Sequence, residues 1–338
     1  MPKSTLGAWR SFSPLAQADI STAQAAGRRY DYDGDLLAPE ADEYYTNEIE
    51  STGSAAPTNA GLITRKFEGS HASKLYPDLV AMALSTLFGT DDVTQQGASS
   101  AYQHEITPSL DPDSCVFRTV IENDGTDQFA YPGVTVKTFK AKGERKQFVT
   151  CEMGLMGRGQ QVANAISKPA NSGESYLSYK EVNFYRGGTF NGTSFSGATL
   201  LSAALISFEA GFDNNATADF LFGDASGLAG AIAPNLTSKY KFDLSAKFEM
   251  EDRTMETDLL AQTEFPVHIP MVGGVANGGY NYTVDLIYPR CRFRQAKPVK
   301  EEGRRRLNAV FQVLEDPTYG AFIARVINLT SSSYVATS

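Results

Sequence analysis

The sequence predicts a mainly β protein built from two similar units. Its 338 residues include 29 Gly, 20 Phe and 16 Tyr, a composition that favours strands and turns. One segment has the spacing of a clear helix, whereas several have the pattern of strands. Landmarks of the first half recur in the second half, which indicates an internal duplication. Because the chain is too long for one small barrel, we expect two β-domains.

The N-terminal region, residues 1–60, is expected to be a mostly irregular arm and loop with a short helix over residues 20–28. It contains eight acids and no Lys or Arg between residues 31 and 50: Asp31, Asp33, Asp35, Glu40, Asp42, Glu43, Glu48 and Glu50. A loop rich in Ser, Ala, Thr, Gly and Pro follows over residues 51–60. We expect the acidic stretch to lie on a surface or in a channel.

The first acids of this stretch have the spacing of a calcium-binding loop. Such a loop needs Gly at its sixth position and ends with Glu at its twelfth. This sequence has Leu36 and Asp42 at those positions. We therefore predict no metal site, and calcium binding is the weaker alternative.

A strand over residues 62–68 leads into the clearest helix, which we place within residues 72–88. Pro77 fits its first turn and Gly89 its C-terminal cap. Apolar residues recur at helical spacing: Leu75, Leu79, Val80, Met82, Ala83, Leu84 and Leu87. They cover more than a narrow stripe, so we expect the helix to contact a neighbouring domain, with Val80 and Leu84 at a subunit interface. The alternative is a helix buried wholly within one domain.

Further strands are expected over residues 115–122, 134–141 and 146–153, packed on both faces. A helix-poor connector follows over residues 154–197, beginning with a Gly-rich turn at residues 154–159. Residues 200–212 form the next strand, in which the segment from Ile206 to Phe212 alternates between apolar and polar or small residues. Residues 330–338 form a polar tail with little to anchor it.

The duplication is clearest in two strand–turn–strand units. Tyr131-Pro132 opens the first, and Tyr288-Pro289 opens the second, 157 residues later (288 − 131). In each unit a Gly turn precedes a basic run, Arg145-Lys146 in the first and Arg304-Arg305-Arg306 in the second. The alternative is a chance similarity of two β-hairpins.

A second landmark lies upstream of these units. Lys66-Phe67-Glu68 is echoed by Lys247-Phe248-Glu249, 181 residues later (247 − 66). The larger offset indicates an insertion in the first half. We therefore divide the chain into an arm and loop (residues 1–60), a first domain (61–170), a connector (171–199), a second domain (200–329) and a polar tail (330–338).

Composition argues against several classes of function. The net charge of −9 makes the chain a poor sequence-independent binder of nucleic acid. Cys115, Cys151 and Cys291 have no metal-binding spacing, so we expect buried thiols in a reducing compartment. The N-terminus has no apolar core of a signal peptide and no stretch has the length of a membrane span, which favours the cytoplasm.

Catalytic motifs were sought and are incomplete. His104-Glu105 begins like a zinc-protease motif, but the second His is absent. The Gly-rich residues 154–159 lack the Lys and Ser or Thr of a phosphate-binding loop. Arg304-Arg305-Arg306 follows two acids, so a mixed-charge hairpin that pairs with a neighbouring subunit fits better than a nucleic-acid site. We predict no catalytic residue and no cofactor.

Four passages carry a resemblance to a known family. They are Phe67-Glu68-Gly69-Ser70-His71-Ala72, Tyr102-Gln103-His104-Glu105-Ile106-Thr107-Pro108, Phe129-Ala130-Tyr131-Pro132-Gly133-Val134 and Glu152-Met153-Gly154-Leu155-Met156-Gly157. With them the chain resembles the tail tube (major tail) proteins of long, flexible-tailed bacteriophages, over residues 60–160 and more loosely over residues 200–328. These passages are hairpin and turn signatures.

The resemblance implies two tandem tail-tube-like β-sandwich or barrel domains, each with a flanking helix, whose inner strands join into a ring-wide β-barrel. Stacked rings would form the tail tube of a virion, the conduit for DNA ejection. The implied partners are tape-measure, tail terminator and distal tail or baseplate proteins, with DNA only in transit. Because the chain is doubled, we expect homotrimeric pseudo-hexameric rings, with homohexameric rings as the alternative. An acidic channel wall would repel DNA and allow fast passage.

Two other classes of protein remain open at this point. A capsid-decorating or receptor-binding virion β-protein would form a compact oligomer and no tubes. A carbohydrate-active β-sandwich enzyme would need a pair of carboxylates in an aromatic cleft, and nothing in the sequence places such a pair.

Overall fold

The computed structural model describes residues 9–25, 27–30, 37–46, 60–109, 111, 114–123, 127–158, 162–163, 168–170, 173–219, 231–233, 240–250 and 252–337. The chain is mainly β, as the sequence predicts, and most of its strands belong to one large antiparallel sheet. The acids expected to form the start of the acidic arm, from Asp31 to Asp35, lie outside the described residues.

The elements of the first part of the chain are β1 (Trp9–Phe12), β2 (Arg29–Tyr30), β3 (Ala38–Thr46), β4 (Ala60–Lys74), α1 (Pro77–Phe88), β5 (Asp92–Gln95), β6 (Tyr102–Ile106), β7 (Arg118–Asn123), β8 (Gln128–Glu144), β9 (Thr150–Gly157) and β10 (Val162–Ala163). They are followed by a 3-10 turn (Tyr179–Glu181), β11 (Tyr185–Arg186), β12 (Thr189–Phe190), β13 (Phe195–Ser196), β14 (Thr199–Leu200), β15 (Leu205–Asp213), β16 (Thr217–Asp219), β17 (Ala231–Ala233), β18 (Lys241–Glu249), α2 (Thr254–Ala261), β19 (Glu264–Asn277), β20 (Tyr280–Glu301), β21 (Arg304–Val313) and β22 (Ile323–Asn328).

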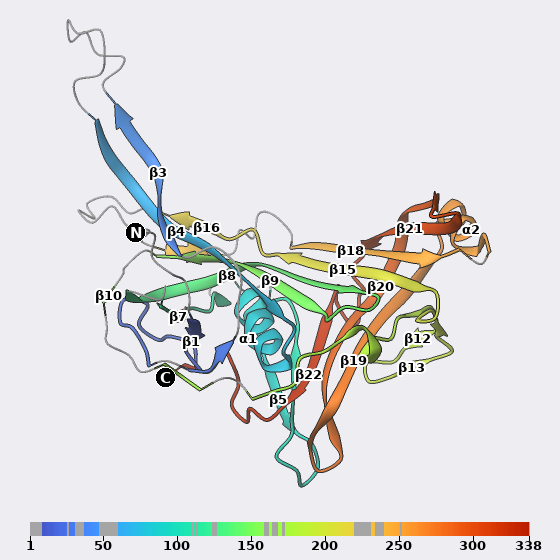
Figure 1. The fold of residues 1–338 in the computed structure, drawn as a ribbon, viewed down its shortest axis with the longest axis horizontal. Coiled ribbons are helices and arrows are strands. Elements are labelled where there is room, and N and C mark those ends of the chain that lie inside the picture. The colour runs from blue at the N-terminus through green and yellow to red at the C-terminus, as the bar shows by residue number, and fades with distance from the viewer. Residues whose placement is uncertain are drawn as a thin grey trace, which may run out of the picture.

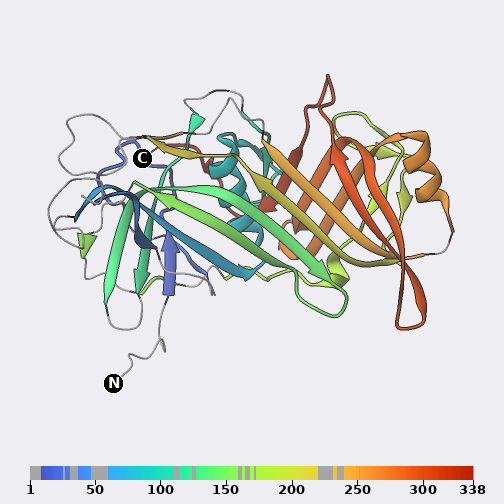
Figure 2. The ribbon, with the colours of Figure 1, turned by 90° about the horizontal axis from the view of Figure 1, so that it is seen from above.

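One row of antiparallel strands runs through the whole chain, in the order β3, β4, β9, β8, β15, β18, β21, β20 (Figure 2). Its strands alternate between buried and exposed residues, as shown by Phe208, Ala210 and Phe212 of β15 on the inner face. This alternation was predicted for residues 206–212, because one face packs on a core and the other meets solvent. Helix α1 lies against the inner face (Figure 1).

The longest strands, β8 and β20, each change neighbours along their length. The first half of β8 pairs with β7 and β10, and its second half pairs with β9 and β15. In the same way, the first half of β20 pairs with β19 and β22, and its second half with β21. Each strand therefore connects two groups of strands around the core.

The register of these strands repeats between the two halves. Val134 of β8 faces Gly157 of β9, and Cys291 of β20 faces Val313 of β21, at offsets of 157 (291 − 134) and 156 (313 − 157) residues. Even the β-bulges recur: at Arg118/Val120 and Phe265/Val267 in the hairpins that enter β8 and β20, and at Val136/Thr138 and Phe293/Gln295 in the hairpins that leave them. Bulges interrupt a ladder at one defined residue, so their recurrence shows that β7–β10 and β19–β22 follow the same pairing pattern.

The upstream landmark needs a correction. Lys66 of β4 does not correspond to Lys247, because the register with β9 and β21 aligns β4 and β18 at an offset of 175 residues (243 − 68), with Glu68 facing Met156 and Asp243 facing Gln312. At this offset Lys66-Phe67-Glu68 matches Lys241-Phe242-Asp243. Sequence similarity alone selected a second Lys-Phe-acid run six residues too late (247 − 241), since the same residue types recur along one strand.

The helix begins later than predicted but ends as predicted. Residues 72–74 belong to β4, and α1 starts at Pro77, where the missing proline donor costs no helical hydrogen bond. It ends at Gly89, whose φ of 79° provides the left-handed cap. All twelve residues of α1 are buried, whereas none of α2 is.

Four regions expected to be irregular or unanchored are more ordered. Residues 1–60 contain β1, β2 and β3, and the described part of residues 20–28 contains turns in place of the predicted helix. Residues 154–157 continue β9 and are not a turn. The connector contains β10 to β13, and Phe184 within it is fully buried. The tail is also held in place, because Tyr334 is buried.

Candidate assembly surface

The two repeats meet through β15, which lies between β8 of the first and β18 of the second. Glu209 of β15 forms an ion pair with Lys140 of β8 at 3.1 Å, and Asp213 of β15 pairs with Lys241 of β18 at 3.5 Å. These side chains are partly exposed, so each pair stabilises the fold little. Their opposite charges match across neighbouring strands.

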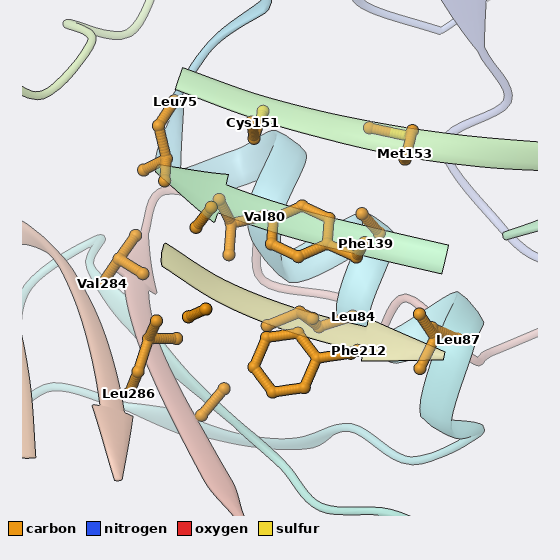
Figure 3. Close-up of a cluster of buried hydrophobic side chains, with 14 of the residues drawn as sticks. Leu75, Val80, Leu84, Leu87, Phe139, Cys151, Met153, Phe212, Val284 and Leu286 are labelled. Carbon is orange, nitrogen blue, oxygen red and sulfur yellow. The ribbon is translucent and has the colours of Figure 1, made fainter. Parts of the chain in front are cut away.

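Beneath this junction α1 packs between the repeats. Figure 3 shows Val80 and Leu84 of α1 among Phe139 of β8, Phe212 of β15 and Leu286 of β20. The helix therefore contacts β6 and β8 of the first repeat as well as β20 and β22 of the second. Contact with a neighbouring domain was expected for this helix, and the structure places that contact within one chain.

The residues predicted at a subunit interface fall into two groups. Val80 and Leu84 are fully buried inside the chain, which gives them an internal packing role. The three arginines lie at the β20–β21 turn, where Arg304 and Arg305 are exposed and Arg306 pairs with Glu301 at 2.6 Å. The turn is therefore a mixed-charge hairpin, as expected, and its basic residues lie far along the chain from α1.

A polar cluster, which the sequence did not reveal, surrounds Asp78 in the first turn of α1. The hydroxyls of Tyr30 and Tyr334 donate to its carboxylate, and the Thr330 hydroxyl donates at 2.8 Å. Arg28 forms an ion pair with the same carboxylate at 3.0 Å. Asp78 thus ties the N-terminal strands, the helix and the C-terminal tail together, which explains the order of the tail.

Glu174 adds a second carboxyl to this Asp78 cluster. It accepts a hydrogen bond from the Asp78 backbone amide at 2.8 Å. Burial, together with the nearby Asp78 charge, raises the pKa of Glu174 to about 8. Glu174 is therefore mostly protonated at neutral pH, since two adjacent buried carboxylates repel each other.

His104 also forms polar contacts near the C-terminal tail. Its Nδ1 lies 3.0 Å from the Asp91 carboxylate and its Nε2 lies 3.0 Å from the Thr330 carbonyl. Nε2 thus contacts the tail directly, and Nδ1 contacts the carboxylate that accepts a hydrogen bond from the Tyr334 amide, which gives this histidine the structural polar role expected for it.

No metal-binding cluster accompanies these features in the part of the chain that the structure describes. There, no three His, Cys, Asp or Glu residues lie close enough to hold a metal ion. Burial raises the pKa of both Cys115 and Cys151 to about 12, so these thiols are poor nucleophiles. No helix in the described segments has the length and apolarity to cross a membrane.

One exposed feature is an edge of β20. Beyond Arg292, where its pairing with β19 ends, β20 pairs with β21 on one side only, as far as the described strands show. Arg294, Lys297 and Lys300 are exposed along this segment. We call residues 294–301 the β20 edge. An edge of this kind is a template for another strand.

The fold is thus a doubled β-protein with one large sheet and a strand edge that has a neighbour on one side only, as far as the described strands show. The comparison with protein families is specific: a model for phage tail tube proteins matches residues 12–313. Because this match covers most of the chain, the protein belongs to the phage tail tube protein family. A search of curated proteins finds no match.

Proposed function

We propose that this protein is a non-enzymatic subunit that polymerises into stacked rings, forming the tail tube through which phage DNA is ejected. The observation that carries the proposal is the single sheet that continues from the first repeat through β15 into the second (Figure 2). Family membership supports it independently. A sheet that crosses from one repeat to the next provides the geometry for a wall that continues from chain to chain.

We further propose three chains per ring, each giving two equivalent units. The recurring strand register supports this count, because two units in one chain supply two of six positions. The two repeats would then be two tail-tube-like domains, at residues 61–170 and 200–329. Rings of six chains remain the alternative.

The exposed face of the long sheet is the proposed channel wall. It bears Lys140, Lys247 and Arg306 beside Glu209 and Glu301. Glu209 pairs with Lys140, and Glu301 pairs with both Lys247 and Arg306. The acidic excess expected for the channel wall from the net charge stays a prediction. A wall of paired charges would still offer DNA few unpaired cations to bind.

The expected partners are tape-measure, tail terminator and distal tail or baseplate proteins, with assembly in the cytoplasm of the bacterial host and a final place in the virion tail. Family membership supports the tail location. These partners would contact the tube ends or its lumen, and DNA would pass without specific binding.

Electron microscopy of the purified protein tests the proposal. Tubes of uniform width with threefold rings and pseudo-sixfold symmetry are expected. Compact oligomers at every concentration would instead favour a decorating or receptor-binding virion protein. Sixfold rings with one chain per position would contradict the count of three while leaving the tube intact.

A further inference from the structure

We infer that neighbouring chains join by repeating the internal junction: β3 of one copy adds to the β20 edge of the next. This inference rests on the proposed polymerisation and specifies the strands that make it. The occupant of the β20 edge is thus a second copy of this chain.

The first step is the equivalence of two hairpins. β15 precedes β18 and pairs with it so that Asp213 faces Lys241. β3 precedes β4 and pairs with it so that Glu40 faces Lys66. Because Lys66 and Lys241 are register equivalents, Glu40 is the counterpart of Asp213. The β3–β4 hairpin of the first repeat is therefore equivalent to the β15–β18 hairpin of the second repeat.

The second step is the equivalence of two edges. Within the chain, β15 lies along residues 138–144 of β8. The offset of 157 residues between β8 and β20 maps this segment to residues 295–301, which form most of the β20 edge. Where β8 has β15 as its second neighbour, the β20 edge has no strand on the side away from β21 among the described residues. β3 likewise pairs with β4 alone within the described strands.

Charge supports the same pairing. Lys140 corresponds to Lys297 at the offset of 157 residues, whereas Glu209, its ion-pair partner in the internal junction, corresponds to Leu36. Lys137 of β8 corresponds to Arg294, so the basic character of the edge recurs. β3 has three acids in its sequence, Glu40, Asp42 and Glu43. An acidic strand is the complement that a basic edge selects.

The helices provide an independent indication. α1 is covered by β8 of its own repeat and by β20 and β22 of the second. α2 packs on β20 of its own repeat, and its Leu260 remains 84% exposed. A second copy that continues the sheet beyond β20 would bring its first repeat over α2, as the second repeat covers α1.

The internal register predicts the contact residue by residue. Asp213 faces Thr138, so Glu40 of the added copy should face Gln295, and Ala38 should face Lys297. Pro298 lacks an N–H, and the exposed lysines beside it keep the free edge from pairing indiscriminately. The selected partner must then supply charge as well as backbone hydrogen bonds.

Cysteine cross-linking between copies tests this register. Chains with Glu40→Cys are mixed with chains with Gln295→Cys under assembly conditions and then oxidised. Directly opposed residues lie within disulfide range, whereas a displacement of four residues adds about 13 Å. The matched control is Glu40→Cys mixed with Val299→Cys, and unmodified chains report on the native cysteines. Circular dichroism checks that every variant is folded.

We expect a disulfide-linked dimer on a non-reducing gel for the Gln295 mixture, at least tenfold more than for the Val299 mixture. If wild-type and variant tubes form but the Gln295 mixture cross-links no more than the control, this inference is wrong and the tube function stands. If the wild-type protein forms no tubes, the proposed function itself fails.

Discussion

The backbone amide of Tyr334 donates a hydrogen bond to the Asp91 carboxylate at 2.6 Å, which fixes the C-terminal tail beside the end of α1. The Tyr334 hydroxyl donates to Asp78 at the other end of the same helix. One tail residue therefore bonds to carboxylates at both ends of α1. Because this helix packs between the repeats, the tail stabilises the junction that the assembly proposal depends on.

Tyr334→Phe should lower the free energy of unfolding by about 1–3 kcal/mol, because Asp78 and Asn328 each lose a buried hydrogen-bonding partner. Urea denaturation measures the loss. Tyr179→Phe is the matched control, since Tyr179 is exposed and should tolerate the change. Equal stability of the two variants would show that the tail contributes nothing.

Stability should fall as the pH rises from about 4.5 to about 8 because of Glu174. Its pKa is raised to about 8 in the folded chain, against an ordinary value of 4.5, so the folded state binds the extra proton in this window. The contribution is complete below the unfolded pKa and is lost as pH rises through the folded pKa. Urea midpoints measured from pH 5 to pH 9 should show a weaker decline for Glu174→Gln than for the wild type. Glu144→Gln, at an exposed site, should follow the wild type.

Val80→Asp and Leu84→Asp should each unfold the single chain, because both side chains are fully buried and an unpaired charge there is costly. Leu79→Ala should lower the free energy of unfolding by about 2–5 kcal/mol, because this side chain is buried as well. Circular dichroism reports the fold. Leu260→Asp on α2 should stay folded and reduce tube growth. If the Val80→Asp chain instead folds but does not polymerise, α1 lies at the subunit interface.

Phe212→Ala should lower the free energy of unfolding by about 3–5 kcal/mol, because its ring packs between the repeats. Its ring centroid lies 5.6 Å from that of Phe88 and 4.5 Å from that of Phe322. Phe148→Ala removes a ring that is 45% exposed and should cost clearly less. If thermal unfolding shows similar losses of stability for the two variants, packing at the junction between the repeats contributes no more to stability than an exposed ring does.

Gly89→Ala should destabilise the protein more than Gly187→Ala, although both glycines have similar positive φ angles of 79° and 75°. The left-handed backbone penalises either alanine by about 1–2 kcal/mol. An added Cβ at Gly89 would also lie 2.4 Å from the Ser114 carbonyl oxygen, whereas at Gly187 it meets nothing within 4 Å. Melting temperatures of the two variants compare the effects directly, and equal shifts would show that Ser114 moves aside freely.

The sequence by itself determined the β class, the doubling, the helix with its Pro77 and Gly89 ends, and the family. These features are local: turn residues, alternation and helical spacing act over a few neighbouring positions and remain visible in one dimension. The exposed arginine turn at residues 304–305 belongs to the same group, because two adjacent acids already predict its mixed charge.

Only the tertiary structure decided which residues meet. It aligned Lys66 with Lys241, ordered the tail through Asp78 and Asp91, and enclosed Val80 and Leu84 within one chain. Each depends on partners that are distant in sequence, from 69 residues for Asp243 and Gln312 (312 − 243) to 256 residues for Asp78 and Tyr334. An apolar helix has the same sequence pattern whether its second face is covered by its own chain or by another, because burial depends on the neighbour in space.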